Sequence, residues 1–205
     1  MQLDISDVSA SYGARTVFHR ISLTLRHGEV LVVSGANGSG KSTLLRVLCG
    51  LQKPADGTVR YCWNGTSHAP RDASHLIGWV SPDLSLYREL TGDENLRFFA
   101  AVRGLSLGAD GIDGLMAQVG LGGRGSDRVS AYSSGMAHRL RYAYALLHHP
   151  PVLLLDEPTV TLDERGAGVV ESIIEAQRQK GIAVVATNDP RELRYGDYVL
   201  TLGAG

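Results

Sequence analysis

The sequence GANGSGKS at residues 35–42 decides how the rest of this chain is interpreted. It matches the pattern G-x-x-x-x-G-K-[ST] at every fixed position. The apolar run EVLVVSG at 29–35 precedes it and is typical of a buried parallel strand. The residues SGKSTLLRVLCG at 39–50 follow with the pattern of a helix that ends at a glycine. A strand before the motif and a helix after it form the context in which this motif binds phosphate.

Each fixed position of the motif has a physical role in binding a nucleotide. Glycines let the backbone curl so that successive N–H groups point at one phosphate, and the helix N-terminus adds its positive dipole end. Lys41 can reach the β- and γ-phosphates, and the hydroxyl of Ser42 can ligate Mg²⁺. A glycine-rich turn that merely precedes a lysine is the alternative, and the correct spacing and context disfavour it. We therefore predict that the chain binds ATP and Mg²⁺.

A second strand ends in two carboxylates. The run VLLLDE at 152–157 is apolar up to Asp156 and Glu157. Consecutive strand residues point in opposite directions, so the two side chains can have separate roles. Asp156 can hold Mg²⁺ through water, and Glu157 can orient or deprotonate an attacking water. Two solvated carboxylates at a strand end are the alternative, which the phosphate-binding motif disfavours.

A third apolar run, VVAT at 184–187, ends abruptly at Asn188. Ligands of open α/β sheets bind at the carboxyl ends of the strands, so Asn188 is a candidate for contact with the γ-phosphate. Its amide donates hydrogen bonds but carries no titratable charge. Two alternatives stay open: an Asx turn with Pro190, or a cap for a helix containing residues 191–193.

Composition and charge limit the possible functions. The chain has 205 residues, of which 43% are hydrophobic, and this is enough for one domain with a sizeable core. Its net charge of −1 gives no support for bulk nucleic-acid binding. No apolar run reaches the roughly 18 residues of a transmembrane helix, and the start of the chain is not expected to be a signal peptide. Cys49 and Cys62 are too few for a disulfide framework, which fits a reducing cytosol.

Several further stretches resemble ABC-type ATPases, the nucleotide-binding subunits of ATP-binding cassette transporters. Tyr12 in SYG lies where that family stacks an aromatic ring on adenine. Residues 35–43 match its Walker A loop, and residues 152–157 match its Walker B strand. The sequence YSSGM at 132–136 takes the place of the L-S-G-G-Q signature, and Asp163 in TLD matches the D-loop aspartate. The resemblance covers nearly the whole chain.

The resemblance implies an α/β fold: a P-loop NTPase, RecA-like core with an N-terminal antiparallel β subdomain and an inserted α-helical subdomain. We expect a single domain over 1–205, with the core and β subdomain at 1–82 and 132–205 and the helical insert at 83–131. The implied catalytic residues are Glu157, Asn188 and Lys41, and the implied metal ligands are Ser42 and Asp156. The other implied site residues are Tyr12, Gly35, Ala36, Asn37, Gly38, Ser39, Gly40, Lys41, Ser42 and Thr43 for the nucleotide, Ser133, Ser134 and Gly135 for the signature, and Asp163 for the D-loop.

The resemblance also implies partners and a location. Separate transmembrane subunits would contact the start of the insert, LYRELTGDENLRFFA at 86–100. A second ATPase subunit, in a homodimer, would lie head to tail with the first, so that the signature faces the other subunit's γ-phosphate. No nucleic-acid partner is expected, and the chain would lie in the cytoplasm on the inner face of the membrane. Within the family, SPDLSLYRELT at 81–91 and the small size resemble the haem exporter ATPase of cytochrome c maturation.

Three departures from the family pattern bear on activity. The signature has Ser134 and Met136 where the family has glycine and glutamine, and Ser133 or Ser134 would also suit a helix N-cap. Pro82 takes the position of the Q-loop glutamine, and Asn188 that of the switch histidine. We predict that hydrolysis persists, because Glu157 supplies the main water-orienting group. We expect it to be slower than in a relative that has the histidine. The alternatives are an ATP-gated switch with little or no hydrolysis, and a soluble ABC protein that acts on ribosomes or DNA.

Overall fold

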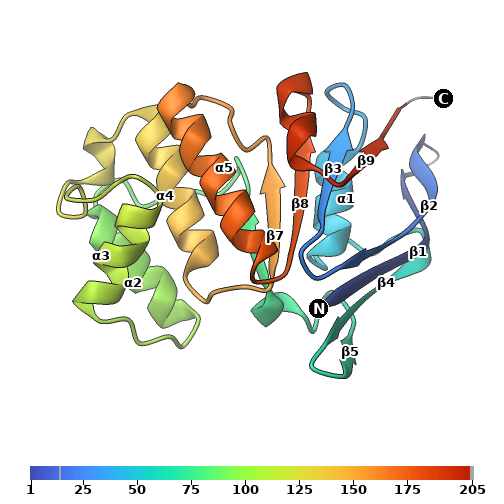
Figure 1. Ribbon diagram of the computed structural model, residues 1–205, viewed down its shortest axis with the longest axis horizontal. Coiled ribbons are helices and arrows are strands. Elements are labelled where there is room, and N and C mark those ends of the chain that lie inside the picture. Colours follow the sequence, from blue (N-terminus) through green and yellow to red (C-terminus); the bar gives the residue numbers. More distant parts are fainter. Residues whose placement is uncertain (14, 204–205) are drawn as a thin grey trace.

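The computed structural model describes residues 1–13 and 15–203 and contains two sheets (Figure 1). One is antiparallel, in the order β2-β1-β4-β5, and the other is parallel, in the order β6-β7-β8-β3-β9. The strands are β1 (Gln2–Tyr12), β2 (Arg15–Arg26), β3 (Val30–Ser34), β4 (Asp56–Trp63), β5 (Thr66–His68), β6 (Ile77–Val80), β7 (Val152–Asp156), β8 (Ile182–Thr187) and β9 (Tyr198–Thr201). The helices are α1 (Lys41–Leu48), α2 (Gly92–Val102), α3 (Ala109–Gln118), α4 (Ser134–Leu146) and α5 (Glu164–Arg178), with short 3₁₀ helices η1 (Ser74–Leu76), η2 (Val129–Ala131) and η3 (Pro190–Tyr195).

The parallel sheet is buried on both faces, which explains its continuous apolar strands. Every residue of β7 and β8 is buried. Leu153 and Leu155 belong to a core cluster shared with α4, α5 and the helices α2 and α3. Val152 and Leu154 point the other way, into a cluster shared with α1 and the antiparallel sheet. The parallel sheet therefore separates two cores.

The predicted order of elements is confirmed. The chain begins with antiparallel strands β1 and β2, and β3 leads into α1 through the phosphate-binding motif. Helices α2 and α3 lie inside the range 83–131 and form the far end of the molecule beside α4 (Figure 1). The limits of the insert stay a prediction. Strand β5 was not anticipated, because three residues show no usable periodicity.

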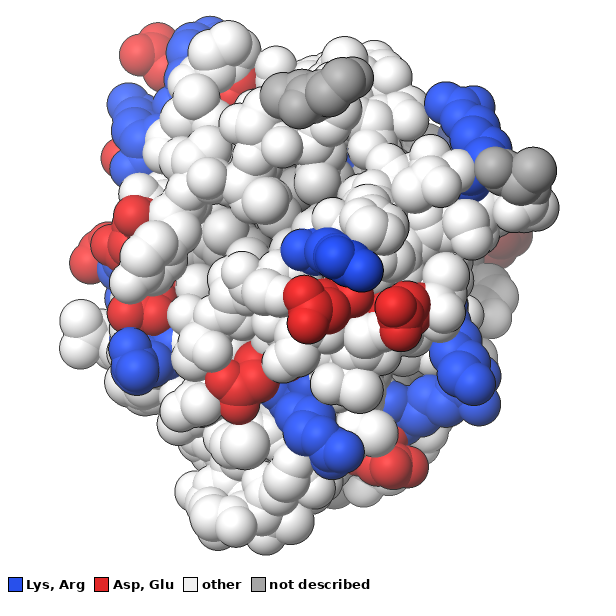
Figure 2. Space-filling view, turned by 90° about the vertical axis from the view of Figure 1, so that its right-hand side faces the viewer, with Lys and Arg blue, Asp and Glu red and all other residues white. Residues whose placement is uncertain are grey.

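The antiparallel sheet lies on the side of the molecule that Figure 2 presents. Positive and negative side chains both occur on this face, in small groups separated by uncharged surface (Figure 2). This face therefore lacks the single basic patch that is typical of nucleic-acid binding. Of the helices within residues 1–13 and 15–203, none combines the length and apolar character that a membrane crossing requires.

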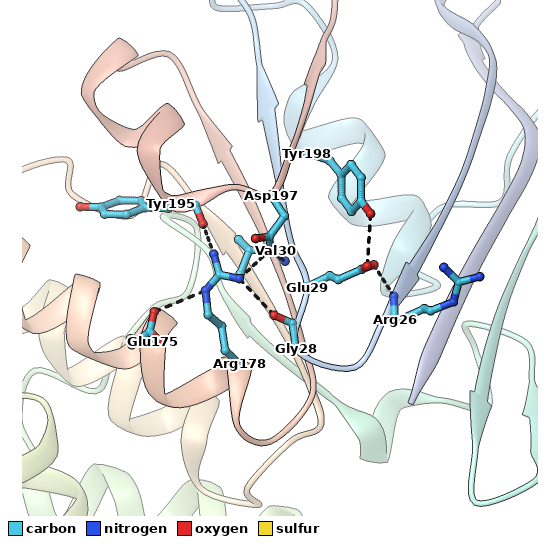
Figure 3. Close-up of polar contacts among 9 residues, drawn as sticks. All are labelled: Arg26, Gly28, Glu29, Val30, Glu175, Arg178, Tyr195, Asp197 and Tyr198. Carbon is cyan, nitrogen blue, oxygen red and sulfur yellow. Dashed lines mark hydrogen bonds and ion pairs between the residues drawn. The ribbon is translucent and has the colours of Figure 1, made fainter.

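One arginine forms hydrogen bonds to several segments at the amino end of the parallel sheet (Figure 3). Arg178, the last residue of α5, donates hydrogen bonds to the carbonyl oxygens of Gly28 at 3.1 Å and Tyr195 at 2.8 Å. It also donates to the carboxylate of Asp197 at 2.5 Å, and the same carboxylate oxygen accepts the N–H of Val30 at 2.8 Å. These contacts join α5 to the starts of β3 and β9, opposite the strand ends that carry the candidate site.

Candidate functional site

The loop between β3 and α1 adopts the tight curve that its glycines allow. Gly35 has a φ of +154° and Gly40 a φ of +105°. A Cβ atom on Gly40 would lie 2.4 Å from a methyl carbon of Val17, and one on Gly35 would lie 2.6 Å from the carbonyl oxygen of Leu202. No residue with a side chain fits at these two positions. The backbone can therefore pass close to a phosphate at the N-terminus of α1.

Lys41 lies inside this curve. Its side chain is only 5% exposed, and its ammonium donates hydrogen bonds to the carbonyl oxygens of Gly35 at 2.8 Å and Ala36 at 3.2 Å. The same nitrogen lies 3.4 Å from Oε1 of Glu157. A positive charge is thus held between the loop and the end of β7. This geometry suits a lysine that binds phosphate oxygens as a point charge.

The donor set beside the loop fits a magnesium ion. The hydroxyl of Ser42 donates to Oδ1 of Asp156 at 3.1 Å, and Asp156 is only 4% exposed. Burial raises the pKa of the Asp156 carboxyl, and the hydrogen bond from Ser42 opposes that shift. Hydroxyl and carboxylate oxygens are ligands that Mg²⁺ accepts alongside phosphate oxygens and water.

Glu157 contacts both the end of β8 and Lys41 at the start of α1. Its backbone has a φ of +49°, a conformation that a non-glycine residue rarely adopts. Its N–H bonds to the carbonyl oxygen of Ala186 at 2.8 Å, so it is held against the end of β8. Its Oε1 faces Lys41, and its Oε2 accepts the backbone N–H of Asn188 at 3.4 Å. Strain of this kind is often found at functional sites.

The side chain of Asn188 points to the phosphate-binding loop. Its amide nitrogen donates to Oδ1 of Asn37 at 2.9 Å. Asp189 caps η3 instead, because its carboxylate accepts the N–H of Arg191 at 2.9 Å. The alternative in which Asn188 caps the following helix is therefore wrong.

A cavity of about 710 Å³ opens beside the loop. Tyr12 stands at its edge with 54% of its surface exposed, so its ring is accessible to a base. Its hydroxyl donates to Gln52 at 2.9 Å and lies 3.4 Å from the hydroxyl of Thr43, and the hydrogen bond with Thr43 lowers the Tyr12 pKa. The residues that line this cavity are Tyr12, Arg15, Thr16, Val17, Asn37, Gly38, Ser39, Gly40, Lys41, Ser42, Thr43, Arg46, Glu157 and Gly203.

The signature and D-loop residues lie at helix starts outside this cavity. Ser133 is the N-cap of α4, and its hydroxyl accepts the N–H of Met136 at 3.2 Å. Ser134 begins the helix, and Gly135 packs against the carbonyl oxygen of Thr161. Asp163 caps α5 by accepting the N–H of Gly166 at 2.7 Å. The N-cap role of Ser133 is confirmed, and contact with a second ATP stays a prediction.

The residues beside Pro82 do not reach the phosphate-binding loop directly. The hydroxyl of Ser81 accepts the backbone N–H of Asp83 at 3.2 Å. The carboxylate of Asp83 pairs with Arg46 of α1 at 3.3 Å. Arg46 also lines the 710 Å³ cavity, so it connects this segment to the site. The interpretation of the sequence missed Arg15 and Arg46, because neither belongs to a motif.

The comparisons with known proteins agree with this geometry. The family model for ABC transporters matches residues 18–160. The cytochrome c biogenesis ATP-binding export protein CcmA of Rhizobium johnstonii is 38% identical over 197 residues, which cover 95% of this chain and 91% of CcmA. An ABC transporter ATP-binding protein of Bacillus subtilis, YhcH, is 37% identical over 188 residues. That match covers 91% of this chain but only 61% of YhcH.

Solved structures show the same fold. An ABC transporter ATP-binding protein from Pyrococcus furiosus superposes with a TM-score of 0.86 at 28% identity and covers 98% of both chains. A dimeric ATP-binding cassette with bound ADP and phosphate has a TM-score of 0.84 at 23% identity, which shows the fold alone. The expected α/β fold, with a parallel core sheet and an antiparallel β part, is confirmed.

Proposed function

This chain belongs to the ABC transporter family of ATP-binding proteins, and from that premise we propose that it binds ATP with Mg²⁺ and hydrolyses it to ADP and phosphate. One observation carries the proposal: Glu157, after β7, contacts both Lys41 at the start of α1 and the backbone N–H of Asn188 after β8, and the Asn188 side chain bonds to Asn37 of the phosphate-binding loop. Members of this family generally hydrolyse ATP. The residues proposed here for catalysis lie together at this edge of the sheet.

Each side chain has a defined task in the proposed reaction. The backbone N–H groups of the loop and the ammonium of Lys41 bind the phosphates. Ser42 and Asp156 would hold Mg²⁺, which when bound neutralises charge on the phosphate oxygens. Glu157 orients the attacking water and accepts its proton. Asn188 donates a hydrogen bond toward the γ-phosphate and takes no proton.

The test is Mg²⁺-dependent phosphate release by the purified chain, beside the variant Glu157→Gln. We expect release by the parent chain and a loss of about 100-fold or more in the variant, with ATP binding retained. Glu171→Gln is the control, because Glu171 is an exposed carboxylate on α5 that pairs with Arg194. Equal rates for the parent and Glu157→Gln would refute the assignment of Glu157.

Pro82 and Asn188 favour a second candidate, an ATP-gated switch. Proline supplies no side-chain donor or acceptor, and Asn188 cannot act as an acid or base. The same experiment separates the two functions. ATP binding without phosphate release, alone and with membrane extract, supports the switch. Release that depends on Glu157 supports the ATPase.

We propose that transmembrane subunits dock at a groove beside the insert. A cavity of about 430 Å³ lies there, lined in part by Leu51, Trp79 and Arg103. Leu51 is 71% exposed. Within residues 1–13 and 15–203, two buried donors of the lining residues, Nε1 of Trp79 and Nε of Arg103, have no hydrogen-bond partner. A largely apolar groove whose lining residues hold unpaired donors suits an incoming segment that supplies acceptors.

Membrane association tests this docking site. Leu51→Asp places a charge in the groove and is expected to reduce co-purification with membranes while ATP binding stays unchanged. Val199→Asp on β9 is the control, because Val199 is 50% exposed and lies on a strand outside the groove. Equal membrane recovery of Leu51→Asp and the parent would argue against the groove.

The transported substrate is a narrower proposal. The extensive similarity to CcmA supports haem export for cytochrome c biogenesis, with two copies of this chain head to tail and Ser133, Ser134, Gly135 and Asp163 at their interface. The chain would then act on the cytoplasmic face of the membrane.

Deletion of its gene should abolish c-type cytochromes, and Glu157→Gln should fail to restore them. Normal cytochrome content in the deletion strain would exclude haem as the substrate. Co-purification of the chain with ribosomes or DNA would favour the alternative of a soluble ABC protein that does not take part in transport.

A further inference from the structure

A buried carboxylate lies behind the site and belongs to none of the family motifs considered above. Glu192 of η3 is only 3% exposed. Burial raises the pKa of its carboxyl, and the hydrogen bond from the hydroxyl of Thr159 opposes that shift. Its Oε2 atom has no partner among the described residues. A carboxylate is costly to bury, so its contacts are of interest.

The first contact reaches the segment that follows Glu157. The hydroxyl of Thr159 donates to Oε1 of Glu192. The preceding carbonyl oxygen, that of Pro158, accepts the hydroxyl of Tyr142 on α4 at 2.8 Å. The two residues after Glu157 are thus held by hydrogen bonds from two elements, α4 and η3.

The second contact reaches the segment that carries Asn188. Glu192 donates its backbone N–H to the carbonyl oxygen of Asp189 at 3.1 Å. The hydroxyl of Thr187, the last residue of β8, accepts the N–H of Asp189 at 2.9 Å. Glu192 therefore contacts the segment after β7 through its side chain and the segment after β8 through its backbone N–H.

We propose that Glu192 is a positioning residue: through its hydrogen bond with Thr159 it fixes the backbone after Glu157 and so aims the Glu157 carboxylate between Lys41 and Asn188. This inference rests on the proposed hydrolysis. The left-handed backbone of Glu157 is strained, and such a conformation persists only where its surroundings hold it. A displacement of about 1 Å of a catalytic group can cost on the order of 100-fold in rate.

Two substitutions separate positioning from stability. Glu192→Leu has similar volume but no acceptor for Thr159, and replacement of a buried charge by an apolar side chain is often neutral or stabilising. We expect kcat for ATP to fall about tenfold or more, while KM, the ATP dissociation constant and the thermal midpoint stay close to those of the parent. Glu192→Gln keeps an acceptor oxygen for Thr159 and should retain kcat within about threefold.

A second variant and a control sharpen the test. Thr159→Val removes the donor and should lower kcat as Glu192→Leu does, and the double variant should show no further loss, because both remove one interaction. Arg194→Ala is the control, since it removes the exposed ion pair between η3 and Glu171 and leaves Thr159 untouched. Parent-like kcat in Glu192→Leu, or equal losses in Glu192→Leu and Glu192→Gln, would overturn the proposal.

Hydrogen–deuterium exchange gives a readout that does not need turnover. In ATP-bound protein, Glu192→Leu should speed exchange of the amides at 159–163 and leave those of α1 unchanged. If the parent chain binds ATP but releases no phosphate, the proposed hydrolysis fails and exchange alone decides the role of Glu192. Unchanged exchange at 159–163 would then refute it.

Discussion

At the residue scale, Asn188 places a side chain that does not titrate beside the phosphate-binding loop. Its amide links the end of β8 to Asn37 in the phosphate-binding loop, over a distance of 2.9 Å. An amide does not titrate, so Asn188, at the position that the resemblance to ABC-type ATPases assigns to a switch histidine, contributes no protonation step. Asn188 therefore places a hydrogen-bond donor beside the phosphate-binding loop without adding a titratable group.

We predict that Asn188→His makes phosphate release depend on pH in a new way. A histidine has an ordinary pKa of about 6.5, so the ratio of variant to parent rates should change between about pH 6 and pH 8. The measurement is kcat across that range for both proteins. Asn188→Gln, which keeps an amide, is the control. A ratio that stays constant with pH would mean that the side chain at 188 does not touch the reacting groups.

At the scale of single elements, α3 contains two glycines, which are poor helix formers. Gly111 and Gly114 lie inside it, and a Cβ atom on Gly114 would meet no other atom within 4 Å. Glycine inside a helix costs roughly 0.5–1 kcal/mol relative to alanine. We predict that Gly114→Ala raises the free energy of unfolding by about that amount and the thermal midpoint by roughly 1–4 °C.

Gly40→Ala is the matched contrast for that substitution. It adds the same methyl group where φ is +105° and where Val17 lies 2.4 Å away. It should lower the thermal midpoint and weaken ATP binding, because the loop must shift. Calorimetry of both variants beside the parent measures the difference. A Gly114→Ala variant that melts below the parent would contradict the helix argument.

The last turn of α5 holds the starts of two strands through Arg178. Arg178→Leu leaves the carbonyl oxygens of Gly28 and Tyr195 without their donor and removes the partner of Asp197 (Figure 3). Hydrogen bonds to charged groups contribute about 1.5–3 kcal/mol each, and partial exposure reduces that value. We predict a loss of about 2 kcal/mol in the free energy of unfolding, measured by urea denaturation.

The control for Arg178 is Arg191→Leu. Arg191 pairs with Asp189, but its side chain is 86% exposed, so its removal should change stability little. ATP affinity should stay unchanged in Arg178→Leu, because Arg178 lies at the opposite end of the sheet from the phosphate-binding loop. Equal stability of the two variants would show that the Arg178 contacts contribute nothing measurable.

At the scale of the whole molecule, burial on both sides of the parallel sheet makes stability depend on pH. His138 of α4 is 2% exposed, and burial, assisted by the nearby Arg141, lowers its pKa to about 4. In the unfolded chain its pKa is about 6.5. The unfolded state therefore binds a proton that the folded state rejects, and stability falls as the pH drops from about 6.5 to about 4.

We predict that His138 contributes about 1.4 kcal/mol per pH unit to this loss. The raised pKa values of the buried carboxyls of Asp156 and Glu192 act in the opposite direction, so a variant comparison is needed. His138→Gln should flatten the dependence of unfolding free energy on pH in this window. His149→Asn, at an exposed position, should leave the slope as it is. The same slope in all three proteins would refute the assignment.

The sequence by itself determined the fold class and most of the candidate site. The loop at 35–42 needs glycine, lysine and serine at fixed short separations, and the carboxylates at 156–157 end an apolar run. Information of this kind is local, because backbone conformation and strand direction act over a few residues. The fold class and these site motifs therefore do not depend on knowing which distant residues are in contact.

Only the tertiary structure decided which distant side chains meet. Asn188 contacts Asn37 across 151 positions of sequence, and Thr159 contacts Glu192 across 33. The sequence left the role of Asn188 open between the phosphate loop, an Asx turn with Pro190 and a helix cap, and no motif in it pointed to Glu192. Packing of β7 and β8 beside β3 sets these pairs, since a buried polar group is stable only where the fold supplies its partner.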